Sequence, residues 1–80
     1  MNDSRQQLDE VFRAALNLPP SASVAGLRRE QVPAWDSMAH VNLMLALESV
    51  FGVNVGPAEA LQLTSYDATA AYLRERGHAV

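Results

Sequence analysis

The 80-residue chain has room for one small core, and we expect a single domain that spans residues 1–80. Its hydrophobic fraction of 49% and charged fraction of 19% indicate a folded chain rather than a disordered one. The absence of cysteine excludes a disulfide framework and a thiolate metal site, and the net charge of −3 argues against a nucleic-acid partner.

The first predicted helix opens at Ser4, which forms a capping-box pattern with Gln7. Residues 1–7 are polar and lack an apolar stretch, so we expect no signal peptide. Apolar residues then recur at helical spacing, namely Leu8, Val11, Phe12, Ala15 and Leu16. Pro19 and Pro20 end this helix. No run in the chain approaches the ~18 apolar residues of a membrane span, so we expect no membrane partner. The expected location is the cytoplasm, and the expected state is a monomer.

Residues 18–35 form a long predicted loop with three prolines and one glycine. Loops of this length are uncommon in small domains and tend to be functional or packed on themselves. Arg28 and Arg29 are expected to be a solvated pair, with partner docking as the alternative. We expect four apolar side chains to anchor the loop to the core: Val24, Leu27, Val32 and Trp35.

The second predicted helix starts at Asp36 or Ser37, and Gly52 is placed to be its left-handed C-terminal cap. At about 100° per residue, two apolar faces result. The expected core face contains Leu43, Leu47, Val50 and Phe51. The second face contains Met38, Val41 and Leu45, with Asn42 and Ser49 on one flank and Glu48 on the other. Either the long loop covers this second face, or a partner outside the domain does.

Pro57 predicts the first position of a short helical turn over residues 58–61. Residues 64–67 carry a second capping-box pattern, which opens a last helix that Gly77 ends. Its expected core side contains Tyr66, Ala70 and Leu73. The chain is therefore predicted to be all-α, a small four-helix bundle of three main helices and one short helix, with a long first loop.

Ser37 stands directly behind Asp36, at the entrance to the most apolar predicted helix. It is either an ordinary N-cap or a displayed hydroxyl to which a group is attached. The free N–H groups and the positive dipole end of the helix would favour a phosphate there. Catalysis by Ser37 would require a base in reach, but we expect His40 to be partly exposed and to project sideways. The dispersed histidines and acids also lack metal-ligand spacing, so we expect neither an enzyme nor a metal site.

Taken together, these residues resemble the acyl carrier protein family, which includes the peptidyl carrier domains. The family's Asp-Ser-Leu reads here as Asp36-Ser37-Met38, and residues 46–52 read A-L-E-x-x-F-G at the right distance. The resemblance covers most of the chain and includes the order of the elements. It implies that Ser37 receives 4'-phosphopantetheine from coenzyme A through a separate, magnesium-using phosphopantetheinyl transferase. The serine oxygen would attack the phosphate and displace adenosine 3',5'-bisphosphate.

The thiol of this arm would carry an acyl or aminoacyl group as a thioester between partner enzymes, such as loading ligases, synthases and transferases. By the same resemblance, Asp36 and Met38 help the transferase to recognise the serine. The residues implied to contact partners are Val41, Asn42, Leu45 and Glu48. Met38 replaces the usual leucine, which conserves volume.

The second helix offers only Asp36 and Glu48 as acids, whereas carriers of fatty-acid synthesis usually have an acidic second helix. We therefore expect a specialised stand-alone carrier of polyketide, non-ribosomal peptide or related secondary metabolism, rather than the housekeeping fatty-acid carrier. The alternative is an unmodified helical interaction module of the same fold, whose second apolar face binds a partner helix.

Overall fold

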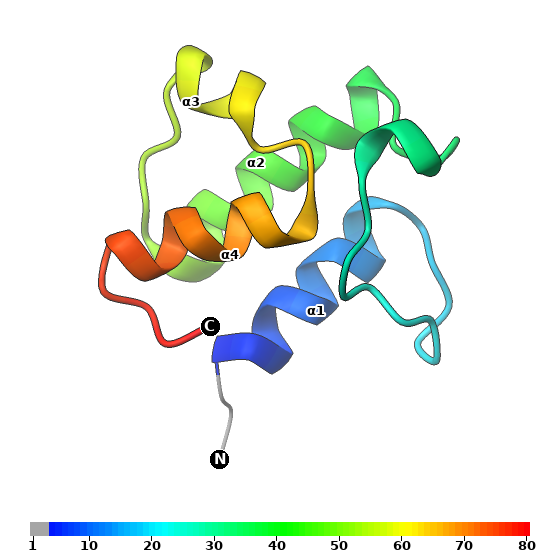
Figure 1. The fold of residues 1–80 in the computed structure, drawn as a ribbon, viewed down its shortest axis with the longest axis horizontal. Coiled ribbons are helices and arrows are strands. Elements are labelled where there is room, and N and C mark those ends of the chain that lie inside the picture. The colour runs from blue at the N-terminus through cyan, green and yellow to red at the C-terminus, as the bar shows by residue number, and fades with distance from the viewer. Residues whose placement is uncertain (1–3) are drawn as a thin grey trace.

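A computed structural model describes residues 4–80 of the chain, and within that range it contains helices and no strand (Figure 1). The elements in chain order are α1 (Ser4–Ala15), the 3-10 turn η1 (Arg29–Gln31), α2 (Ser37–Phe51), α3 (Pro57–Gln62) and α4 (Tyr66–Glu75). The prediction of an all-α fold is confirmed. Residues 1–3 of the polar N-terminal stretch lie outside the described residues.

Side chains from α1, α2, α4 and the long loop form one hydrophobic core. Its fully buried members include Leu8 and Phe12 of α1, Leu43 and Leu47 of α2, and Leu73 of α4. Short α3 lies at the edge of the molecule, away from α1 (Figure 1). The predicted core residues of the first and last helices are confirmed, except that Ala15 is only partly buried.

Helix α2 is capped at both ends, and its C-terminal cap is the predicted Gly52. The Asp36 carboxylate accepts a hydrogen bond from the Ala39 N–H at 2.9 Å, as an N-cap does. Gly52 adopts the left-handed conformation at φ 67°, and its N–H donates to the Glu48 carbonyl. Pro57 is the first residue of α3, as predicted.

The prediction that Val50 lies in the core is wrong, because 46% of its surface is exposed. Val50 lines a shallow hollow between α1 and α2 whose walls include the small side chains of Ala14 and Ala46. These side chains are too short to cover it. Met44, which we did not assign to the core, is buried instead.

Two predicted N-caps differ in the structure. Ser4, the first described residue, is already helical and so is not the cap before α1. At α4 the N-cap is Ser65, not Thr64, and its side chain accepts from the Ala68 N–H at 3.0 Å. In both places several polar residues in succession can cap a helix, and the sequence alone does not rank them.

The long loop is packed on the core, as its predicted anchors require. Val24 and Trp35 are buried, while Leu27 and Val32 are partly buried against the core. The loop also contains η1, which the sequence analysis did not predict. Its backbone is bonded to the segment before α4, where the Arg29 N–H donates to the Thr64 carbonyl at 2.9 Å.

The two leucines at positions 45 and 47 of α2 provide a matched test of this packing. Leu47 is fully buried, whereas Leu45 is 58% exposed. We expect Leu47→Ala to lower the free energy of unfolding by about 2–5 kcal/mol, because it leaves a cavity in the core. Leu45→Ala should change it by less than about 0.5 kcal/mol. Urea denaturation followed by circular dichroism measures both, and equal losses would contradict the described orientation of α2.

Tyr66 joins α4 to α1 through a buried ring and a polar tip. Its hydroxyl donates to the Asp9 carboxylate, and its ring packs on Phe12 with centroids 5.1 Å apart. Burial, with the hydrogen bond to Asp9 and that residue's negative charge, raises the pKa of Tyr66 to about 12. The Arg5 guanidinium, 5.2 Å from the ring centroid, acts in the opposite direction.

Because its pKa is higher in the folded state, Tyr66 should contribute stability below pH 10 that is lost between about pH 10 and 12. The variant Tyr72→Phe leaves Tyr66 as the single tyrosine of the chain. We expect its phenolate absorbance to appear with a midpoint near 12 in buffer and near 10 in concentrated urea. A midpoint near 10 in the folded protein would contradict the burial of Tyr66 together with its contact with Asp9.

Candidate functional site

Ser37 is the first residue of α2 and is exposed to solvent. The capping role belongs to Asp36, whose carboxylate accepts from the Ala39 N–H and whose carbonyl accepts from the His40 N–H. The interpretation of Ser37 as the N-cap is therefore wrong. Its hydroxyl is left on the surface, beside the positive end of the α2 dipole.

A partly buried guanidinium lies next to this hydroxyl. Arg29 directs its NH2 group to the Ser37 Oγ at 3.5 Å and its Nε to the Trp35 carbonyl at 3.3 Å. Arg28, by contrast, is exposed and pairs with Glu30 at 3.5 Å. The expectation of a solvated arginine pair therefore holds for Arg28 and is wrong for Arg29. No local pattern indicates that this arginine reaches the serine, since eight residues separate them.

Trp35 and His40 form a buried hydrogen-bonded pair that links the loop, α2 and α3. The Trp35 indole N–H donates to His40 Nδ1 at 3.0 Å, and His40 Nε2 lies 2.8 Å from the Ala60 carbonyl. Since Nδ1 accepts, the neutral ring carries its proton on Nε2 and donates it to Ala60. The prediction of a core Trp35 is confirmed, with 2% of its surface exposed.

The prediction of a partly exposed His40 is wrong, because its side chain is buried and both ring nitrogens are hydrogen-bonded. The physical reason is that α3 and the loop close over this side of α2, which helical periodicity does not report. Because its ring nitrogens bind Trp35 and Ala60, His40 does not act as a base for Ser37 in this arrangement.

The second apolar face of α2 is uncovered. Met38, Val41 and Leu45 expose 71%, 54% and 58% of their surfaces. We call these three residues the exposed face. The reading in which the long loop covers it is wrong, since that loop packs against the core through Val24 and Trp35. Leu61 of α3, which the sequence analysis did not single out, is 78% exposed.

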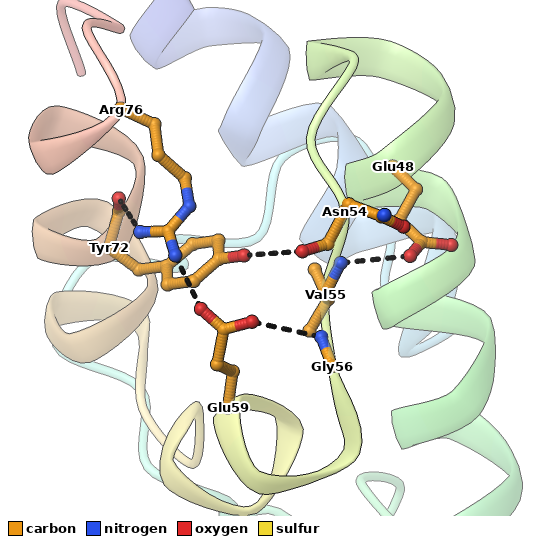
Figure 2. Close-up of polar contacts among 7 residues, drawn as sticks. All are labelled: Glu48, Asn54, Val55, Gly56, Glu59, Tyr72 and Arg76. Carbon is orange, nitrogen blue, oxygen red and sulfur yellow. Dashed lines mark hydrogen bonds and ion pairs between the residues drawn. The ribbon is translucent and has the colours of Figure 1, made fainter.

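The flanks of the exposed face differ from each other. Asn42 and Ser49 are exposed, and Asn42 is thus accessible to a partner. Glu48 is half-buried, and its carboxylate accepts from the Val55 N–H at 2.9 Å (Figure 2). Glu48 therefore holds the α2–α3 connection, a structural role that the sequence analysis did not predict for it.

A polar network fixes α3 against α4 on this side of the molecule. Figure 2 shows the Glu59 carboxylate between the Gly56 N–H, 3.0 Å away, and the Arg76 guanidinium. The Arg76 guanidinium lies 3.6 Å from the centroid of the Tyr72 ring, and the Tyr72 hydroxyl donates to the Asn54 carbonyl at 3.2 Å.

Among residues 4–80, no group of three or more metal-ligating side chains is gathered in one place. None of the helices in this described range combines the length and hydropathy that crossing a bilayer requires. The chain matches no protein-family model. A comparison with curated proteins also found no match. What the site can do is therefore inferred from its own residues.

The Trp35–His40 pair can be tested for its contribution to the stability of the fold around Ser37. His40→Leu keeps the side-chain volume but removes the acceptor of the buried Trp35 indole N–H, while the partly buried Ala60 carbonyl keeps the Leu63 N–H. We expect a loss of about 1–3 kcal/mol in the free energy of unfolding, since one buried polar group is left unpaired. Asn42→Leu, at an exposed position of the same helix, is the control. Urea unfolding followed by Trp35 fluorescence measures both. Equal stability of the two variants would show that the Trp35–His40 pair contributes nothing to the free energy of unfolding.

Proposed function

We propose that this chain is a carrier protein, monomeric and cytoplasmic, which bears a 4'-phosphopantetheine arm on Ser37 and shuttles acyl or aminoacyl groups between the enzymes of a biosynthetic pathway. The observation that carries the proposal is the solvent exposure of Ser37 at the N-terminus of α2, where Asp36 performs the capping instead. A serine used only for structure would be expected to make that cap itself.

The residues around Ser37 suit a phosphate. The first turn of α2 presents N–H groups and a positive dipole end, and the Arg29 guanidinium reaches the Ser37 Oγ. The arm would supply a thiol, which binds the carried group as a thioester. The chain has no cysteine of its own to compete in that role.

During attachment, the Ser37 oxygen would form a bond to the phosphorus of coenzyme A that bears the pantetheine. The bond from that phosphorus to the leaving oxygen breaks and releases adenosine 3',5'-bisphosphate. The hydroxyl proton passes to a base of the phosphopantetheinyl transferase, which also provides the magnesium. This chain holds the Ser37 hydroxyl in an accessible position. The transferase would recognise the serine through its neighbours Asp36 and Met38.

The exposed face of α2 is the proposed docking surface for the transferase and the later partner enzymes. Val41 and Leu45 supply apolar contact, and Asn42 supplies a polar contact at the flank. Charge contributes little, because α2 and its N-cap carry only two acids, Asp36 and Glu48. Electrostatic steering should therefore be weak, which favours partners of a specialised polyketide or non-ribosomal peptide pathway over those of fatty-acid synthesis.

Modification of Ser37 is directly testable. Incubation of the purified chain with coenzyme A and a broad-specificity phosphopantetheinyl transferase should raise its intact mass by one phosphopantetheine. Ser37→Ala should abolish the gain, because the acceptor oxygen is missing. Intact-mass spectrometry measures both, with Ser49→Ala, which removes another exposed hydroxyl of α2, as the control that keeps the gain.

An unmodified wild type, tested against several transferases that are active on other carriers, would contradict the proposal. The same result would favour the alternative, an unmodified module that binds a partner helix through the exposed face. That module would bind its partner equally well as wild type and as Ser37→Ala.

A further inference from the structure

A hollow of about 660 Å³ lies beside Ser37, between η1 and the segment that leads into α4. Its lining combines charged, hydroxyl and aromatic side chains: Arg28, Arg29, Glu30, Trp35, Thr64 and Ser65. Arg29 belongs to this lining and also reaches the Ser37 Oγ. The hollow therefore adjoins the proposed attachment site.

The walls of the hollow are held by main-chain hydrogen bonds. The Arg29 N–H donates to the Thr64 carbonyl at 2.9 Å, and the Tyr66 N–H donates to the Leu27 carbonyl at 2.8 Å. Between them, Arg28 and Ser65 form an isolated antiparallel bridge. This pairing fixes η1 to the start of α4, so the position of Arg29 does not depend on its side-chain contacts.

The Arg29 guanidinium has no counter-ion within residues 4–80. Its described partners are two neutral oxygens, the Trp35 carbonyl and the Ser37 hydroxyl. Glu30, the acid in the lining, pairs with Arg28 instead. A planar guanidinium that is fixed at one end and lacks a carboxylate is well suited to bind phosphate oxygens.

We infer that Arg29 binds the phosphate of the arm on Ser37, and that the first part of the arm lies in the hollow against Thr64 and Ser65. The inference rests on the proposed function. The arm carries amide and hydroxyl groups, which can form hydrogen bonds with the Thr64 and Ser65 hydroxyl groups of the lining. Arg29 is a positioning residue: it orients the arm and takes no part in bond formation.

Nuclear magnetic resonance of the ¹⁵N-labelled chain, before and after complete modification, tests the inference. Modification should shift the backbone amides of Arg29, Thr64 and Ser65 in addition to those at the start of α2. In Arg29→Gln, which removes the charge but keeps a donor for the Trp35 carbonyl, the shifts at Thr64 and Ser65 should be lost. Arg29→Lys should retain part of these shifts, because lysine keeps the positive charge but lacks the two parallel N–H donors of the guanidinium.

The control is Arg74→Gln, which removes an arginine from the last turn of α4, at the opposite end of the molecule from the start of α2 (Figure 1). It should keep the full wild-type shifts. Intact mass separates the two proposals. Without a mass gain in any chain, the proposed function itself fails. A wild type that gains the mass but shows shifts confined to the first turn of α2 overturns the role of Arg29 and the hollow, while the carrier function stands.

Discussion

The hydrogen bond from the Trp35 indole to His40 is the interaction on which the geometry around Ser37 depends. Two residues after the tryptophan, the chain must leave the loop and begin α2, and the buried indole fixes where that occurs. The Trp35 carbonyl then receives the Arg29 side chain, and Asp36 is placed to cap the helix. One buried ring thereby orders both sides of the serine and leaves its hydroxyl in solvent.

One face of α2 is buried in the core, and the other is exposed to solvent. Burying a leucine side chain stabilises a fold by about 1.5–3 kcal/mol, and Leu43 and Leu47 contribute in this way. The exposed face forgoes that gain at three positions, although a domain of this size has little core to spare. The proposed function accounts for this exposure by using the face as a docking surface. The polar network around Glu59 and Arg76 keeps α3 in place without using this face.

The sequence predicted most of the fold, because its signals are local. Helix-end signals such as Gly52 and Pro57, and apolar spacing such as that of Leu8 and Phe12, depend only on residues within a few positions of each other. The wrong prediction for His40 has a non-local cause. The burial of His40 depends on its contact with the carbonyl of Ala60, twenty residues away along the chain.

The site was predicted in the same uneven way. The start of α2 near Ser37 and the two apolar faces of this helix follow from the local sequence, whereas the choice of Ser37 as the attachment site rests on the resemblance to carrier proteins. The contact of Arg29 with Ser37 depends instead on the pairing of η1 with the segment before α4, which no local pattern encodes. Likewise, the hydrogen bond of Glu48 to Val55 depends on the path of the chain after α2, so its structural role was missed.

The most direct test of the central claim is the mass of this chain purified from the cells that produce it, with the modified residue located by fragmentation. The account predicts a population that carries a phosphopantetheine, free or acylated, on Ser37 alone. A chain that is wholly unmodified at Ser37 while its cells make active phosphopantetheinyl transferase would contradict it.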